Sequence, residues 1–352
     1  MIQYLPAHLH ELSSSWKSLH ANDAACFGFI LNKAGYYIDS AGLDEQVYDA
    51  VSKELGLDHP DTIKASASVA STYRSLGRFN EAKERGSEIL KQRTRLLGVD
   101  HPDTIDAAES LAATYHRLGR HSKAERLESE VLEQRTRSLG VDHPDTINAS
   151  ANLAVTYHYL GRDSEAERLT LKVLRQKTKS LGANHPETVF VSATLAIIYS
   201  RLGRHSEAER IESEVLKQWR RQLGLDHPDT IKAMSRLAAT YGHLERYSEA
   251  EQLESEILMQ RKKLLGPDHP DTIKASAKLA VTYSHLGRYS EAEQLESYVL
   301  EQREKSLGAD HPDTIKASAS LEVTRRYANA VQLESEVLKQ GTDSLGVDHL
   351  DT

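Results

Sequence analysis

The chain has 352 residues, of which 39% are hydrophobic, 27% charged and only 6% aromatic, and its formal net charge is −8. This composition is too polar for one large core, but it suits an elongated array in which each unit buries a thin seam against its neighbours. The acidic balance argues against nucleic acid as a partner, because gripping phosphates requires a surplus of Lys and Arg along one face.

Cysteine content and hydropathy exclude further classes. Cys26 is the only cysteine, so no disulfide can form within the chain, and we expect a cytoplasmic location. We expect Cys26 to be a small buried hydrophobe rather than a nucleophile. No stretch approaches the ~18 consecutive apolar residues of a membrane span, and Met1 to Leu12 lacks a signal-peptide pattern, so we expect no membrane partner.

The N-terminal segment differs from the rest of the chain. Ala7 to Leu19 reads as one amphipathic helix. Phe27 to Leu55 then looks like a degenerate helix pair that keeps Gly42 near the position of a turn glycine. With the turn placed there, its second helix is shorter by about seven residues than those that follow.

A His-Pro dipeptide then recurs seven times, in steps of 42 residues. Its histidines are His59, His101, His143, His185, His227, His269 and His311. Such strict self-similarity indicates a solenoid. We therefore divide the chain into residues 1–57 (helix and degenerate unit), 58–346 (seven units) and 347–352 (the start of a further, truncated unit).

Each unit predicts two helices, most clearly in residues 265–308. The first helix starts around Pro270, because proline suits the first helical position, and ends at Leu286-Gly287. The second helix opens with Ser290 and Glu293 in the spacing of a capping box and stops at Gly308. The same box recurs at Ser122/Glu125, Ser164/Glu167, Ser206/Glu209 and Ser248/Glu251.

The seventh unit is shortened. His311 and His349 are 38 residues apart, and the four missing residues remove the turn between the two helices. Leu321 to Tyr327 replaces that turn, so we expect a shortened or irregular hairpin. The chain stops inside the next repeat motif, which fits either a polar capping end or a fragment of a longer array; we favour the fragment.

The pattern Leu-Ala-x-x-Tyr-x-x-Leu-Gly followed by Glu-Ala resembles the tetratricopeptide repeat. The 42-residue length with Leu-Gly-x-Asp-His-Pro between units is similar to the kinesin-light-chain type, which also forms the sensor arrays of fungal and bacterial STAND NTPases of the NB-ARC or NACHT class. This resemblance covers roughly Asp58 to Thr352. It implies an all-α fold, a right-handed α-solenoid of stacked antiparallel helix pairs.

The resemblance also implies a binding groove, because in tetratricopeptide arrays the first helix of each pair lines a concave surface that receives a peptide or helix. Positions on that face vary between copies, either because they set specificity or because they drift. The candidate groove residues are Lys64, Asn148, Asn152, Val155, His158, Tyr159, Phe190, Ile197, Arg201, Lys232, His243, Lys274, His285 and Lys316. The apolar Val155, Tyr159, Phe190 and Ile197 form the expected anchor region, and lysines at both ends could pair with acidic partner residues.

One departure from the kinesin-light-chain pattern matters. That groove carries paired asparagines before the Leu-Ala of the first helix, and these hold the backbone of the cargo peptide. Here only Asn152 remains, and the corresponding pairs include Ser235-Arg236 and Ala277-Lys278. This puts cargo binding of that kind in doubt.

No catalytic or metal constellation is present in the sequence. The turn histidines recur once per unit, and stacked helices lie roughly 8–10 Å apart, too far for successive histidines to share one zinc. We expect them to cap or pack the turns. The chain also lacks a phosphate-binding loop, a zincin motif and a Gly-x-Ser-x-Gly motif. We expect no enzyme activity, cofactor or metal.

The sequence thus favours a non-catalytic protein-interaction scaffold, the repeat or sensor part of a STAND-type signalling protein that binds a peptide or protein. The alternatives are a kinesin-light-chain-like cargo adapter, which would need a heptad coiled coil that residues 1–55 do not show, and a scaffold that self-associates through the array ends. The sequence does not identify the partner.

Overall fold

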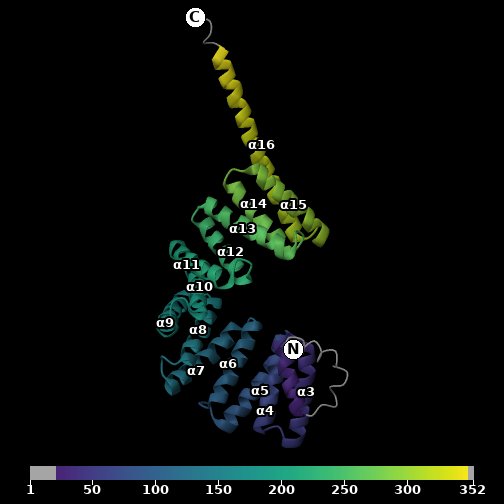
Figure 1. Cartoon of the computed structure of the whole chain (residues 1–352), viewed down its shortest axis with the longest axis vertical. Helices are drawn as coiled ribbons and strands as arrows, with labels where there is room; N and C mark the ends of the chain where they lie inside the picture. Colours follow the sequence, from purple (N-terminus) through teal and green to yellow (C-terminus); the bar gives the residue numbers. More distant parts are fainter. Residues whose placement is uncertain (1–20, 348–352) are drawn as a thin grey trace. The chain divides into compact units, whose positions relative to one another are not determined.

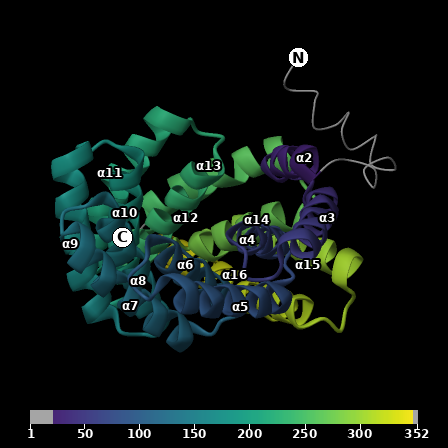
Figure 2. The ribbon, with the colours of Figure 1, turned by 90° about the horizontal axis from the view of Figure 1, so that it is seen from below.

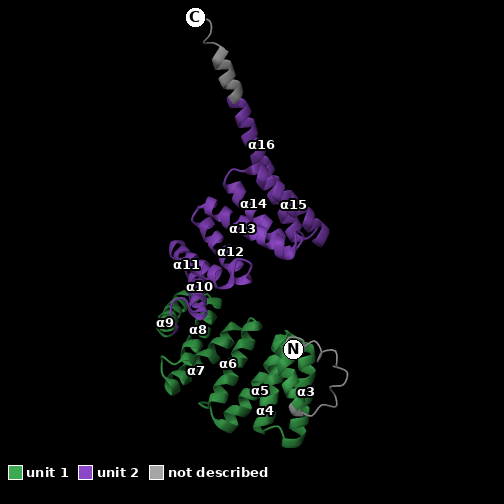
Figure 3. Ribbon diagram, in the orientation of Figure 1, with its two compact units in different colours: residues 1–180 green, residues 181–352 purple. Residues whose placement is uncertain are grey.

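The computed structural model describes residues 21–347, and every regular element in that range is an α-helix. The chain forms two compact units, unit 1 up to Ser180 and unit 2 from Leu181 (Figure 3). The helix expected at Ala7–Leu19 and residues 348–352 lie outside the described range. The predicted division at residues 57 and 346 concerns repeat identity and stays a prediction.

Unit 1 is a row of antiparallel helix pairs. Its helices are α2 (Ala21–Lys33), α3 (Tyr37–Leu55), α4 (Pro60–Ser75), α5 (Phe79–Leu97), α6 (Pro102–Arg117), α7 (His121–Leu139), α8 (Pro144–Tyr159) and α9 (Asp163–Leu181). Consecutive helices from α2 to α8 pack side by side in chain order (Figures 1 and 2). The all-α class and the stacked helix pairs are thereby confirmed for this unit.

Unit 2 repeats the arrangement. Its helices are α10 (Pro186–Arg201), α11 (His205–Leu223), α12 (Pro228–His243), α13 (Tyr247–Leu265), α14 (Pro270–His285), α15 (Tyr289–Leu307) and α16 (Pro312–Val347). Its core runs through Val215, Trp219, Met234, Leu237 and Leu258, which come from three successive helices. No helix among residues 21–347 is long and apolar enough to cross a bilayer.

The histidine of each His-Pro dipeptide caps the first helix of its pair, which confirms the capping role predicted for these seven residues. In α14 the Nδ1 atom of His269 accepts a hydrogen bond from the backbone N–H of Asp271, at 3.1 Å, and Pro270 occupies the first turn. This bond satisfies one of the amides that a helix N-terminus leaves without a partner. The same bond is present at His59, His101, His143, His185, His227 and His311.

The turn between paired helices depends on one left-handed residue. Gly287 has φ +73°, and its N–H donates to the carbonyl of Ser284 (3.1 Å) while that of Arg288 donates to Tyr283 (2.9 Å). These two bonds form a Schellman motif, which satisfies the last carbonyls of α14. The motif places Arg288 at the N-cap of α15.

The predicted capping boxes were therefore wrong. Because the turn ends at Arg288, α15 begins at Tyr289 and Ser290 lies inside its first turn, where it cannot act as the N-cap. The side chain of the N-cap residue Arg288 makes no capping bond either, and its Nε atom donates to Glu291 at 2.5 Å. Helices α7, α11 and α13 likewise begin after an arginine without a side-chain capping bond.

The N-terminal pair uses the same turn, at a different glycine from the one the sequence indicated. Gly35 has φ +87°, and the N–H of Tyr36 donates to the carbonyl of Leu31 at 2.9 Å. Gly42 lies inside α3, which has 19 residues like the other second helices. The expected shortening of this second helix was wrong, because α2 already ends before Gly35 and α3 can therefore begin at Tyr37.

One turn lacks its glycine. Glu245 occupies that position between α12 and α13 and, with φ +59°, is the one non-glycine residue of the described chain with a positive φ. The hydrogen bonds of the turn persist, since Arg246 N–H still donates to Tyr241 at 2.9 Å. The left-handed conformation costs a residue with a Cβ atom about 1–2 kcal/mol, so this turn is strained.

The seventh pair does not form a hairpin. α16 runs without a break for 36 residues, from Pro312 to Val347, where the sequence predicted a shortened or irregular hairpin. The prediction was wrong because the shortening removes the Leu-Gly sequence at which the chain turns back in the other helix pairs. Without a residue suited to the left-handed conformation, the two helical halves continue in one line.

Buried carboxylates cross the seams between successive pairs. The Oγ1 atom of Thr282 on α14 donates to Glu254 of α13, at 2.6 Å, and Thr72 on α4 donates to Asp44 of α3, also at 2.6 Å. Burial raises the pKa of Glu254 and of Asp44 above the ordinary carboxyl range, and the threonine bonds offset that only in part. Burial also raises the pKa of Glu212.

Arginines at the turns tie neighbouring pairs together at the surface. The guanidinium of Arg288 lies 4.3 Å from the ring centre of Tyr283, and its Nη1 donates to Glu251 of the preceding pair at 2.6 Å. The hydrogen bond from Arg288 lowers the pKa of Glu291. Arg162 and Arg246 make the same set of contacts.

Cys26 is exposed on α2, so its predicted burial was wrong. It lies on the side of α2 opposite to Ala24, Phe27 and Leu31, which cluster with α3. Its neighbours in the sequence gave no sign of this, because α2 is apolar on most of its circumference.

We expect Glu245→Gly to stabilise the protein by about 1 kcal/mol, because glycine adopts the left-handed conformation without the Cβ clash. The measurement is the urea midpoint followed by circular dichroism. Gly287→Glu, the reverse change in the next turn, should lower the midpoint by a similar amount. A lower midpoint for Glu245→Gly would show that the glutamate side chain contributes more than its backbone costs.

We expect Glu254→Gln to raise the melting temperature at pH 7.5 and to change it less at pH 5. The raised pKa means that folded Glu254 binds its proton more tightly than the unfolded chain does. Its contribution to stability is therefore full below the unfolded pKa and is lost as the pH rises through the folded pKa. Glu291→Gln is the control of opposite sign, since its pKa is lowered and its favourable contribution is present at neutral pH. Equal shifts at both pH values would contradict this account.

Candidate functional site

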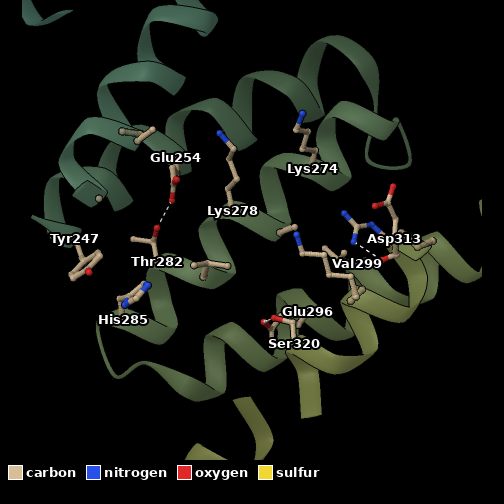
Figure 4. Close-up of a pocket in the computed structure, with 18 of the residues that line it drawn as sticks. Tyr247, Glu254, Lys274, Lys278, Thr282, His285, Glu296, Val299, Asp313 and Ser320 are labelled. Atoms are coloured by element: carbon tan, nitrogen blue, oxygen red, sulfur yellow. Dashed lines mark hydrogen bonds between the residues drawn. The ribbon is translucent and has the colours of Figure 1, made fainter. Parts of the chain in front are cut away.

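A cavity of unit 2 with a volume of about 540 Å³ lies between α12, α14 and α16 and is also lined by residues of α13 and α15 (Figure 4). Small apolar side chains form part of its wall, among them Ala239, Ala277, Val281 and Ala317. These residues come from the first helices of three successive pairs. Ala239 and Val281 are 42 residues apart and hold the same position in the repeat, while Ala277 and Ala317 come from other positions of their helices.

Lysines stand around the apolar wall. Lys274 and Lys278 lie one turn apart on α14, and Figure 4 shows both at one rim of the cavity, while Lys316 comes from α16. All three side chains are exposed or rim-lining, and none makes an ion pair within residues 21–347. Three unpaired ammonium groups beside an apolar wall can bind carboxylates while the wall accepts apolar side chains.

A second cavity of about 270 Å³ continues this surface toward α12. It shares Lys274 and Lys278 with the first and adds Lys232 and Arg236 at the equivalent positions of α12. Lys232 pairs with Asp229 at 3.2 Å. We call the residues Lys232, Arg236, Lys274, Lys278 and Lys316 the basic face.

Three carboxylates line the larger cavity, those of Glu254, Glu296 and Asp313, and two of them accept hydrogen bonds from neighbouring helices. Glu254 accepts the bond from Thr282, and Glu296 accepts one from Ser320 at 2.5 Å. The positive charge of Lys278 lowers the pKa of Glu254, but burial outweighs it and leaves the pKa raised. The basic face thus gathers five Lys and Arg side chains although the whole chain carries −8.

The equivalent positions of α6 and α8 in unit 1 have different chemistry. Asp106 and Glu109 on α6 both pair with Arg135, at 3.1 and 2.8 Å, and Asn152 donates to Glu109 at 3.0 Å. Asn148 accepts a bond from Lys177 at 2.9 Å. These groups satisfy one another, so this surface offers fewer open charges than the basic face.

Some of the predicted groove residues come together in unit 2 and others do not. His243, Lys274, His285 and Lys316 line the larger cavity, and Lys232 lines the smaller one. In unit 1, Lys64 is exposed beside a separate cavity that α2 to α4 enclose, far along the chain from the basic face.

Three predicted rings also hold the pairs together. His285 stacks on Tyr247 at 4.4 Å, His243 stacks on His205 at 4.4 Å, and Tyr159 stacks on His121 at 4.8 Å. Each stack joins the last residue of one first helix to the start of the preceding second helix. His158 is engaged with Asp163 at 3.0 Å. These side chains therefore support the fold as well as bordering the surface.

The expected apolar anchor region is divided between the two units. Val155 and Tyr159 belong to unit 1, whereas Phe190 and Ile197 belong to unit 2, as does the predicted groove residue Arg201. Phe190 is 64% exposed and Tyr159 58% exposed, while Val155 and Ile197 are half-buried. Phe190 and Tyr159 are thus accessible to a partner, and their joint use stays a prediction.

Sequence reasoning missed Arg236 and Lys278 as binding candidates. Both occupy the second position of the pair where kinesin light chain has asparagine, so their alignment at 42-residue spacing was the available signal. This alignment alone does not indicate a binding site, because a single charged residue on a helix is usually solvated. Only the cavity walls show that these two lie beside Lys232 and Lys274. Within residues 21–347, no group of three His, Cys, Asp or Glu side chains could hold a metal ion.

Solved structures with the same fold include several repeat proteins. A Podosopora anserina protein with nearly identical TPR-like repeats, named for a kinesin light chain, is 24% identical, with a TM-score of 0.52 over 58% of this chain and 97% of that one. A STAND protein with a tetratricopeptide repeat sensor from Pyrococcus horikoshii is 16% identical, with a TM-score of 0.61 over 92% of this chain and 49% of that one. BtubC from P. vanneervenii is 20% identical, with a TM-score of 0.54 over 67% and 94%.

Sequence comparison is more specific than the shared fold. No curated protein is significantly similar to this chain. Models of the tetratricopeptide repeat, however, match residues 65–135, 146–187, 193–229, 230–271 and 272–313. These matches cover well over half of the 352 residues, and they overlap the helix pairs from α4 to α15. The chain belongs to the tetratricopeptide repeat family.

Proposed function

We propose that the chain is a non-catalytic protein-interaction scaffold whose basic face binds an acidic, extended segment of a partner protein. Tetratricopeptide repeats imply protein–protein interaction, and the finer assignment rests on one observation: Lys274, Lys278 and Lys316 stand unpaired around an apolar cavity. Partner carboxylates would pair with these ammonium groups, and partner apolar side chains would lie against Ala277 and Val281.

The surroundings of the basic face favour an acidic protein segment over nucleic acid. Glu254, Glu296 and Asp313 line the same cavity and would repel a continuous row of phosphates. A peptide carries its charges at intervals and can leave those positions neutral. The one remaining groove asparagine, Asn152, is bonded to Glu109, which argues against the backbone clamp of a kinesin-light-chain adapter.

The double change Lys274→Glu/Lys278→Glu should weaken binding of a fluorescein-labelled peptide, in which four Glu alternate with Leu and Ser, by at least about tenfold, since two attractive charges become repulsive. Fluorescence anisotropy measures this. The matched control Lys262→Glu/Lys263→Glu makes the same charge change on α13, away from the cavity, and should leave the affinity within twofold. Equal losses of affinity in both variants would show that the effect comes from net charge alone and would contradict the assignment of the basic face.

We further propose that this cytoplasmic scaffold serves as the sensor part of a STAND-type signalling protein. The support is that the fold of the Pyrococcus horikoshii protein matches 92% of this chain with only about half of its own length. Sequencing of the transcript upstream of Met1 should then find an open reading frame with a Gly-x-x-x-x-Gly-Lys-Ser/Thr motif. An in-frame stop codon directly before Met1 would argue against this role and would leave the basic face unaffected.

A further inference from the structure

The second half of α16 presents an apolar face that the other second helices bury. Residues 327–338 align with residues 289–300 of α15 once the four missing turn residues are allowed for. Val299 of α15 is 2% exposed, whereas its counterpart Val337 is 67% exposed and the adjacent Leu338 is 69% exposed. Residues 327–338 kept the side chains of a packed helix, but in the described part of the chain most of these side chains are exposed.

The first half of α16 lacks the matching contact. Its Ile315 corresponds to the isoleucine after Asp-Thr in the other pairs, and it is 57% exposed, whereas Ile273 is 6% exposed. Ile273 meets Val299 in one buried cluster of the preceding pair. The other counterparts, Ile63, Ile105, Ile147 and Ile231, are all buried. Ile315 and Val337 are therefore the counterparts of Ile273 and Val299, which contact each other in the preceding pair, but here the two residues are apart.

These halves cannot meet within one chain. They are 22 residues apart on a continuous helix, and at 1.5 Å per residue this is a separation of about 33 Å. The rest of the first half is well placed, since Thr314, Ala317 and Leu321 are buried against α15. Only the contact with a second helix is missing.

We propose that two copies of this chain exchange these halves and form a closed dimer, in which the two α16 helices pack antiparallel. Ile315 of each copy then packs against Val337 and Leu338 of the other, which reproduces the contact between Ile273 and Val299. A hinge too short to reverse the chain is a recognised cause of such swapping. The proposal goes beyond the basic face and does not depend on it.

One residue of α16, Glu322, favours this swapped dimer over an assembly in which copies stack end to end. Glu322 stands where the other pairs have a buried alanine, for example Ala280. In unit 1 the equivalent Ala70 clusters with Ala107 of the next first helix. A carboxylate at this position opposes docking of a further first helix, because the charge would be desolvated. The swapped pair keeps Glu322 at its edge, paired with Arg326 at 3.0 Å.

The mass in solution tests the dimer. Light scattering of the full chain should give twice 39.3 kDa, and Val337→Asp/Leu338→Asp and Ile315→Asp should each raise the dimer dissociation constant at least about tenfold, as expected for charges placed in an apolar contact. Met259→Asp, at an equally exposed residue of α13, is the matched control and should leave it unchanged. A wild-type monomer at all concentrations, or variants that dimerise as wild type does, would overturn the proposal.

The missing turn provides a test that destroys no contact. Replacing Arg325 by Tyr-Ser-His-Leu-Gly restores the 42-residue spacing, so the two halves can fold onto each other within one chain. The restored chain should be a monomer with unchanged helix content. A restored chain that remains dimeric would show that another surface holds the copies together.

Cross-linking tests the antiparallel register directly, in a Cys26→Ser background that removes the one native thiol. A mixture of Ile315→Cys and Val337→Cys chains should form a disulfide between the two variants under mild oxidation. Val337→Cys alone should not cross-link with itself. Self-cross-linking of Val337→Cys without the mixed product would replace the swapped arrangement by a parallel one and refute this proposal.

Discussion

The left-handed residue between the helices of each pair is the constraint on which the other features depend. Where glycine occupies it, as at Gly287, two backbone bonds close the first helix and the chain reverses within three residues. Reversal brings the second helix onto the first and creates the seam that the next pair covers. Glu245 shows that the turn survives without glycine at a cost in free energy, and α16 shows that it does not survive the loss of its residues.

The seams are more polar than an alternating pattern of apolar residues suggests. Threonine hydroxyls on first helices donate to carboxylates of the preceding second helices, as Thr282 does to Glu254. Such groups are costly to bury, yet they fix which helical turn meets which. The arginine that starts each second helix adds a surface tie, as Arg288 does between Tyr283 and Glu251. Together these contacts favour one register along the stack.

The first helices use the same geometry for opposite chemistry in the two units. In unit 1 the variable positions of α6 and α8 are engaged within the fold, as Asp106 and Glu109 are with Arg135. In unit 2 they leave Lys274, Lys278 and Lys316 beside an apolar wall. A repeat scaffold can therefore localise a strong positive surface within an acidic chain, because successive copies place one helical position side by side.

The sequence by itself determined the all-α class, the pairing of helices, the histidine caps and most helix ends, because His-Pro, Leu-Gly and the 42-residue period act over a few neighbouring residues. It also named Lys232, Lys274 and Lys316 from their position in the repeat. Only the tertiary structure decided that Gly35 rather than Gly42 turns the first pair, and that Arg288 rather than Ser290 precedes α15. It alone shows Lys278 at the cavity and Val337 and Ile315 uncovered. The cavity and the uncovered face depend on which surfaces meet across the stack, and a local pattern carries no information about a contact such as that between Thr282 and Glu254, which lie 28 positions apart.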